Sequence, residues 1–173
     1  SDLVPKDSAQ AVGWYRKAAE QGFAPAQFNL GNCYYNGRGV AEDKAMALEL
    51  FRKAAEQGLV NAQTVLGDLY ADGDGVAADP AQAATWYRKA ADQGFAAAQD
   101  SLGDLYYDGR GVKQDFAAAA AWYRRAAEQG HADAQNSLGY LYAEGKGVKR
   151  DATEAVAWYL RAADQGHGGA QDN

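Results

Sequence analysis

The sequence predicts an all-α fold: a right-handed α-α superhelix (solenoid) of helix-turn-helix repeats with a 36-residue period. The first observation is an acidic-Gln-Gly tripeptide that returns without a break in register, starting at residues 20, 56, 92, 128 and 164. The second is a Gly-x-Gly-Val tetrapeptide that returns at the same spacing, starting at residues 37, 73, 109 and 145. A fixed period of about 20 to 50 residues is typical of solenoids and propellers. The residues between the two markers favour helices, and therefore a solenoid.

Each unit contains two predicted helices. In the second unit the first helix is expected at about 43–56, because small and apolar residues recur there at helical spacing: Ala47, Leu50, Phe51, Ala54 and Ala55. The second helix is expected at about 60–72 for the same reason, with Ala62, Leu66, Leu69 and Tyr70 on one face. The helices of the other units follow by adding or subtracting 36.

Cap residues indicate where these helices begin and end. Asp43 precedes the first helix of its unit, where its carboxylate can accept from the free amides of the first turn. The same acid recurs at positions 7, 79, 115 and 151, and Pro80 is a favoured first helical residue. Gly58 and its equivalents are expected to end the first helix, and the Gly-x-Gly-Val loop to end the second. Each unit is thus helix, short turn, helix, loop.

Neither helix of a unit can bury its apolar stripe alone, so neighbouring hairpins must stack. Small residues such as Ala54 and Gly67 let the helices approach closely, and aromatic residues such as Trp86 and Tyr87 fill the remaining space. We expect a single solenoid domain over residues 1–173. The expected repeats are approximately 5–40, 41–76, 77–112, 113–148 and a partial 149–173.

Composition excludes several classes of protein. The chain carries 17 basic and 23 acidic side chains, a formal net charge of −6, which argues against nucleic acid as a partner. No apolar run of about 18 residues is present and residues 1–10 lack a signal-peptide pattern, so we expect a soluble chain without membrane insertion, of unknown localisation. A single Cys excludes an internal disulfide.

The repeated pattern resembles the Sel-1-like repeat family, an α-solenoid relative of the tetratricopeptide repeats. In the third unit it reads Ala83-x-x-Trp86-Tyr87-x-Lys89-Ala90-Ala91-Asp92-Gln93-Gly94, then Ala98-Gln99-x-x-Leu102-Gly103-x-x-Tyr106, then Gly109-x-Gly111-Val112. The match covers essentially the whole chain and departs at Leu50-Phe51, in place of Trp-Tyr, and at Gly13. The resemblance implies a protein-binding adaptor or scaffold. We expect that the chain is not an enzyme, because no constellation of its residues predicts an activity.

The resemblance also indicates which surface binds. Tetratricopeptide repeats carry an L-G-x-x-Y segment on the helix that lines their concave groove, and Leu66-Gly67-x-x-Tyr70 matches it. The face of the second helix opposite its apolar stripe varies between units and is rich in Asp, Asn and Tyr. The predicted groove residues are Phe28, Asn32, Tyr35, Asn36, Asn61, Thr64, Asp68, Asp72, Asp100, Asp104, Tyr107, Asp108, Asn136, Tyr140 and Glu144.

These residues suggest an extended basic protein segment or peptide as the partner. Asp68, Asp104 and Asp108 would meet its cations, Asn32 and Asn136 its backbone, and the tyrosines its apolar or cationic groups. The opposite bias appears on the first helix, which carries Arg-Lys pairs such as Arg52-Lys53. Two alternatives stay open: the charges are solvated or paired between repeats, or the chain is a structural array that acts as a spacer or self-associates through its terminal helices.

Residue types that could support chemistry are better explained by the repeat. His131 and His167 align with the apolar turn residues Phe23, Leu59 and Phe95, and Cys33 aligns with a core leucine. The pair Asp68 and Asp72 returns 36 residues later, which suits an electrostatic surface more than a unique catalytic centre. We therefore expect no catalytic residues, no metal site and no cofactor.

Overall fold

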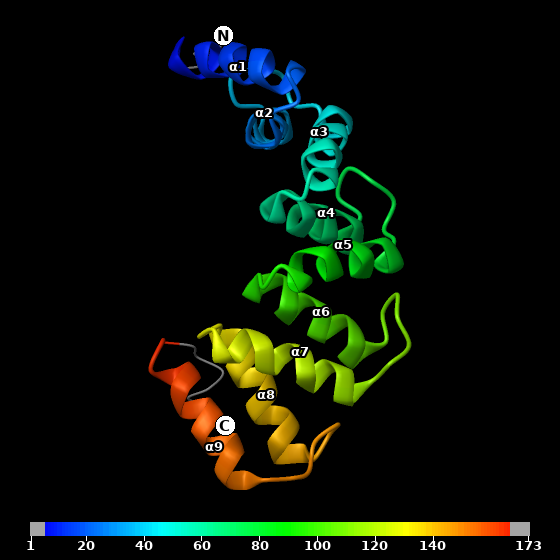
Figure 1. Cartoon of the computed structure of the whole chain (residues 1–173), viewed down its shortest axis with the longest axis vertical. Coiled ribbons are helices and arrows are strands. Elements are labelled where there is room, and N and C mark those ends of the chain that lie inside the picture. Colours follow the sequence, from blue (N-terminus) through cyan, green and yellow to red (C-terminus); the bar gives the residue numbers. More distant parts are fainter. Residues whose placement is uncertain (1–5, 167–173) are drawn as a thin grey trace. The chain divides into compact units, whose positions relative to one another are not determined.

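The computed structural model describes residues 6–166, with side chains from Ser8 onward. This part of the chain contains nine helices joined by short loops, and no strand (Figure 1). It divides into two compact units, Ser1–Asp79 and Pro80–Asn173, which we describe separately. The first holds α1 (Lys6–Glu20), α2 (Ala24–Asn36), α3 (Lys44–Glu56) and α4 (Val60–Asp72). The second holds α5 (Pro80–Asp92), α6 (Ala96–Asp108), α7 (Phe116–Glu128), α8 (Ala132–Glu144) and α9 (Ala152–Ala163).

The predicted helices agree with the observed ones to within about one residue. The all-α prediction with paired helices every 36 residues is confirmed. One cap differs, because α1 begins at Lys6 and so includes Asp7 rather than following it. The single domain over 1–173 and its repeat boundaries stay a prediction.

Helix ends show the expected cap chemistry. The Asp115 carboxylate accepts from the amides of Ala117 and Ala118, both at 2.9 Å, and Asp43 and Asp151 cap α3 and α9 in the same way. Each second helix ends at a glycine of the Gly-x-Gly-Val loop in the left-handed conformation, with φ between 64° and 74°. The recurring acids and glycines of the sequence therefore set the helix boundaries.

Within each unit, consecutive helices pack against one another through small residues. The predicted apolar stripes of α3 and α4 are buried. The glycine in the second helix is required because the first helix of the next repeat lays an aromatic ring on it. A Cβ atom at Gly103 would lie 2.6 Å from the ring of Tyr123, and one at Gly31 would lie 2.7 Å from the ring of Phe51. The low content of branched aliphatic residues thus reflects close helix packing.

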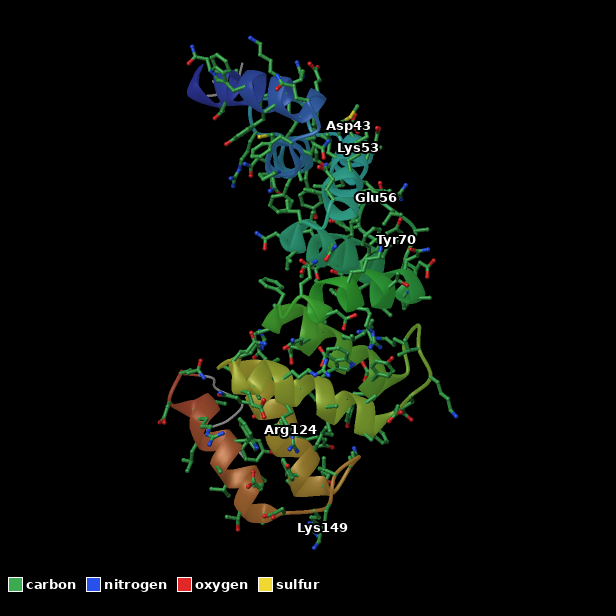
Figure 2. The ribbon with its side chains drawn as sticks, in the orientation of Figure 1. Asp43, Lys53, Glu56, Tyr70, Arg124 and Lys149 are labelled. Carbon is green, nitrogen blue, oxygen red and sulfur yellow. The ribbon has the colours of Figure 1, made fainter. Side chains whose placement is uncertain are left out.

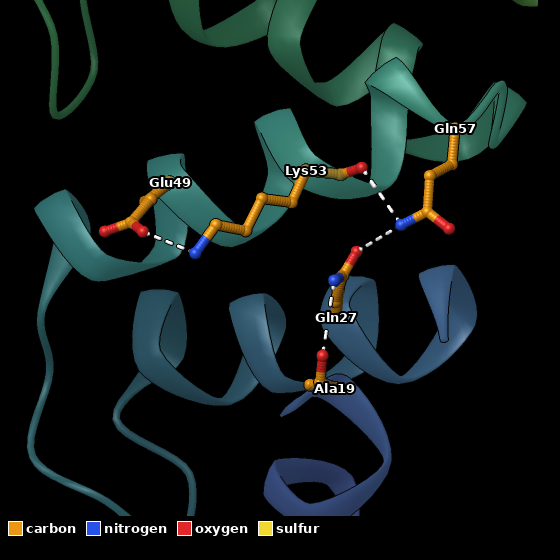
Figure 3. A network of polar contacts seen from close by, with 5 residues as sticks. All are labelled: Ala19, Gln27, Glu49, Lys53 and Gln57. Carbon is orange, nitrogen blue, oxygen red and sulfur yellow. Dashed lines mark hydrogen bonds and ion pairs between the residues drawn. The ribbon is translucent and has the colours of Figure 1, made fainter. Parts of the chain in front are cut away.

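Pairs of glutamines, one buried in a second helix and one exposed in the next repeat, join neighbouring repeats within each unit and are here called the glutamine ladder; Figure 3 shows one such pair, Gln27 and Gln57. Gln27 is 6% exposed and donates to the Ala19 carbonyl at 3.3 Å, while Gln57 of the following repeat donates to Gln27 Oε1 at 2.7 Å. The second unit repeats both bonds through Gln99 with Ala91 and Gln129, and through Gln135 with Ala127 and Gln165. The glutamine of the tripeptide marker is therefore a contact between repeats.

We expect Gln99→Ala to lower the free energy of unfolding by about 1.5 kcal/mol, because the buried Gln99 side chain loses its bond from Gln129 and its bond to the Ala91 carbonyl together. Urea unfolding followed by circular dichroism measures the change. Gln10→Ala, the same substitution at an exposed side chain of α1, is the control and should change stability by less than about 0.5 kcal/mol. Equal effects of the two substitutions would show that the ladder adds no stability.

Candidate functional site

The predicted surface residues of α6 and α8 form the wall of a pocket in the second unit. The cavity measures about 290 Å³. Four of its lining residues were predicted from the sequence, and three were not. The lining residues are Asp104, Tyr107, Asn136 and Tyr140, with Tyr123, Ser137 and Leu141 in addition.

Tyr123 of α7 forms the base of this pocket and holds Asp104 in place. Its ring is buried against Gly103, and its hydroxyl donates to Asp104 Oδ1 at 2.7 Å. Burial raises the pKa of Asp104, an effect that the Tyr123 hydrogen bond partly offsets. Burial and the neighbouring carboxylate also raise the pKa of Tyr123 well above its usual value, so this phenol stays protonated and donating.

Two acceptor oxygens on the same helices are buried without a hydrogen-bond partner: Asp100 Oδ1 and Asn136 Oδ1. Burial raises the pKa of Asp100 from its ordinary value of 3.8 to about 7, and the charges of Asp104 and Asp133 contribute further. A buried acceptor without a donor costs about 1 to 3 kcal/mol. Each of these two oxygens therefore lowers the stability of the unit as long as no donor reaches it.

The other end of the pocket is aromatic. Tyr107, Phe116 and Tyr140, here called the aromatic cage, surround the ammonium of Lys146, whose Nζ lies 5.3, 5.7 and 5.0 Å from the respective ring centroids. Lys146 donates to the hydroxyls of Tyr107 at 2.9 Å and Tyr140 at 3.1 Å. These two bonds raise the pKa of Lys146, and the ammonium lowers the pKa of Tyr140.

The first unit has an equivalent pocket of about 240 Å³. Its lining contains the predicted residues Asn32, Tyr35, Asn36 and Asp68, together with Phe51, Val65 and Leu69. The Tyr35 hydroxyl donates to the carboxylate of Asp74, which also receives the Lys44 ammonium at 2.5 Å. Here an ion pair takes the place that the aromatic cage has in the second unit.

The remaining predicted residues do not line either pocket. Asn61, Asp72, Asp108 and Glu144 are exposed, and Asp108 lies 3.4 Å from Arg110. Thr64 donates its hydroxyl to the Val60 carbonyl at 3.0 Å. Phe28 is half-buried, with its ring 5.6 Å from that of Phe51, so it packs on the core more than it projects as an anchor.

A group that could hold a metal ion lies beside the pocket. Ligand atoms of Asp100, His131 and Asp133 lie within 4.8 Å of one another. The His131 Nδ1 atom is 3.8 Å from Asp100 Oδ2 and accepts from the Ala134 amide at 3.4 Å, as a helix cap does. The sequence gives no sign of this proximity, because Asp100 and His131 are 31 positions apart. His167 lies outside the described residues.

Sequence patterns also left the role of the basic first helix open. The arginine of each Arg-Lys or Arg-Arg pair donates to a tyrosine hydroxyl of its own repeat, as Arg52 does to Tyr70 at 2.7 Å. The same bond joins Arg16 to Tyr34, Arg88 to Tyr106 and Arg124 to Tyr142. Figure 2 labels Tyr70 on α4 and Arg124 on α7. These arginines therefore stabilise the helical hairpin, because each links the first helix of its repeat to the second by a hydrogen bond.

Paired helices with a constant period, repeated caps and repeated inter-helix contacts define an α-solenoid repeat protein. Comparison with family models narrows this class: the Sel1 repeat matches residues 1–23, 24–59, 60–95, 96–131 and 132–167. The chain belongs to the Sel1 repeat family, and the resemblance predicted from its sequence is confirmed. Sel1 repeat proteins are generally non-catalytic scaffolds for protein interaction. None of the curated proteins compared matches the chain.

Solved structures resemble it closely. A protective antigen of uropathogenic Escherichia coli strains, displaying an SLR fold, is 46% identical with a TM-score of 0.87, over 90% of this chain and 33% of that one. A Sel1 repeat protein from Oxalobacter formigenes is 43% identical with a TM-score of 0.87, over 97% and 49%. An immunity protein from Pseudomonas aeruginosa is 27% identical with a TM-score of 0.55, over 92% and 58%. The chain thus spans about a third to a half of the first two.

Helix length bears on the membrane question. Among the residues that the structure describes, no helix combines the length and apolarity needed to cross a bilayer.

Proposed function

We propose that this chain is a protein-binding scaffold that holds an extended basic segment of its partner against the second helices of the repeats. The family supports the scaffold role. The pockets support the choice of surface, because each unit places an aspartate of the second helix, Asp68 or Asp104, beside tyrosine and asparagine side chains.

The observation that carries the basic character of the partner is the set of acceptors in the second unit. Asp100 and Asn136 each bury an oxygen without a donor, and burial disfavours the charged form of Asp104. A lysine or arginine of the partner would supply both a positive charge and several donors to such a surface. An acidic segment would add repulsion to a surface that already holds three carboxylates, Asp100, Asp104 and Asp133.

Charge reversal tests this proposal. A labelled peptide in which lysine alternates with serine is the probe, and fluorescence polarisation is the readout. We expect Asp68→Lys and Asp104→Lys to weaken binding at least about tenfold each, or about 1.4 kcal/mol. The wild-type affinity should fall as salt is raised, because part of the attraction is between exposed charges.

Asp92→Lys is the matched control, since Asp92 is an exposed acid at the end of α5, outside the pocket. The same change of charge there should leave the affinity within about twofold. Preference of the wild-type chain for a glutamate-serine peptide, or an equal loss in all three variants, would contradict the proposal.

One observation favours self-association as a second candidate. Trp14 of α1 is 70% exposed, and Leu160 of α9 is 60% exposed, although the tryptophan equivalent to Trp14 in α7, Trp122, is buried. Exposed apolar faces of this kind pack against another copy in many oligomers. Light scattering over a range of concentrations separates this candidate from a monomeric scaffold.

A further inference from the structure

The Lys146 ammonium makes an unusually large number of contacts for a lysine in a loop. It occupies the variable position of the fourth Gly-x-Gly-Val loop, and three rings and two hydroxyls of the second unit surround its ammonium. A cation over an aromatic face is attracted by the negative potential of the ring. The cage is therefore a binding site for an ammonium group, and its present occupant belongs to the chain itself.

The chemistry of the cage favours a primary ammonium. The hydroxyls of Tyr107 and Tyr140 both accept from Nζ, so the occupant must donate at least two hydrogen bonds while it faces the rings. A quaternary ammonium has no N–H to donate. A lysine side chain meets both requirements, as the bound Lys146 demonstrates.

The cage is continuous with the pocket proposed above to receive the partner. Tyr107 and Tyr140 belong to both, and Asp104 lies on the same pocket wall. A lysine that enters through the pocket reaches the same hydroxyls and adds attraction to the Asp104 carboxylate. Exchange of one ammonium for another preserves the charge and the hydrogen bonds of the cage.

We propose that the aromatic cage of Tyr107, Phe116 and Tyr140 is the site for one lysine side chain of the partner segment, and that Lys146 fills it when no partner is bound. This inference rests on the proposed function and names one specific contact within it. Lys146 then acts as a tethered competitor that the partner lysine displaces. In the first unit the corresponding tyrosine, Tyr35, is engaged by the Lys44–Asp74 ion pair, so the lysine site is assigned to the second unit.

Substitution of Lys146 removes the competitor, and the direction of the resulting change in affinity tests the proposal. We expect Lys146→Ala to tighten binding of the lysine-serine peptide about three- to tenfold in fluorescence polarisation. Lys149→Ala is the matched control: Lys149 is exposed on the same loop, so its loss changes the net charge equally but leaves the cage intact (Figure 2). The control should change affinity less than about twofold.

A second arm tests the chemistry of the ligand. The Tyr140→Phe substitution is made in the Lys146→Ala background, because Lys146 also donates to the Tyr140 hydroxyl and would lose the same bond. In that background Tyr140→Phe keeps the ring and removes an acceptor, so it should weaken binding of the lysine peptide. Its effect on a trimethyl-lysine version should be small, because that version does not donate to the hydroxyl. Circular dichroism verifies that each variant is folded.

The outcomes separate this inference from the proposed function. If the wild-type chain binds the lysine peptide but Lys146→Ala binds it no more tightly than Lys149→Ala, the cage assignment is wrong and the scaffold proposal stands. Weaker binding by Lys146→Ala also overturns the assignment, since Lys146 would then contact the partner directly. No binding by any form overturns both.

Discussion

Gly147→Ala is expected to lower the free energy of unfolding by roughly 3 to 5 kcal/mol. Gly147 has a φ of +67°, which costs a residue with a Cβ atom about 1 to 2 kcal/mol. The larger part of the effect is steric, because a Cβ atom at this position would lie 2.2 Å from the backbone carbon and oxygen of Phe116. Backbone atoms at the start of α7 have little freedom to move. Urea unfolding followed by circular dichroism measures the loss.

Gly130→Ala separates backbone strain from the steric clash. Gly130 also has a positive φ, +89°, but a Cβ atom there meets nothing within 4 Å. We expect a loss of only about 1 to 2 kcal/mol, the cost of the left-handed conformation alone. If Gly147→Ala and Gly130→Ala lower the free energy of unfolding by the same amount, the close approach of the fourth Gly-x-Gly-Val loop to α7 does not contribute to the effect of Gly147→Ala.

Asp100→Asn is expected to stabilise the chain by about 2 kcal/mol at pH 8 and to have little effect near pH 4. The folded-state pKa of Asp100, about 7, lies above that of the unfolded chain, near 3.8. Between these values the folded state binds more protons, so the stability contributed by this group falls as pH rises. Above pH 7 the Asp100 carboxylate is ionised in both the folded and the unfolded state, and the folded state bears the full cost of burying this charge. The neutral amide of the asparagine removes that cost. The difference between the two pKa values sets an upper bound of about 4 kcal/mol on the stabilisation by Asp100→Asn. Relaxation of the structure around the buried charge lowers the value below this bound.

The measurement is the free energy of unfolding of both forms between pH 4 and pH 8. Asp92→Asn removes a carboxylate from an exposed position and serves as the control. The difference in the free energy of unfolding between Asp92→Asn and the wild type should not increase between pH 5 and pH 7. A constant difference between Asp100→Asn and wild type at every pH would contradict a raised pKa for Asp100.

The helices were predictable because the repeat displays the same local signals several times. Periodic apolar residues such as Ala47 and Phe51, an acid such as Asp43 and a glycine such as Gly58 each act within one hairpin. Local interactions of this kind can be predicted from the sequence, and their repetition removes most of the ambiguity about where each helix begins and ends.

The candidate site was predictable only in part. Helical periodicity places Asp104 and Asn136 on the pocket side of their helices, but it does not show that Tyr123 underlies them or that Lys146 reaches Tyr107. Those contacts join different repeats, and they depend on side-chain direction and on the loop residues that differ between repeats. The proximity of Asp100 and His131 escaped prediction for the same reason.

The glutamine ladder bears on how such a chain changes its length. Gln27 with Gln57 in the first unit, and Gln99 with Gln129 and Gln135 with Gln165 in the second, present the same amide pairing at three junctions between repeats. A duplicated or deleted 36-residue segment would therefore meet a compatible neighbour at both new joins. Copying or deleting a whole unit can therefore lengthen or shorten the array without disturbing these contacts between repeats.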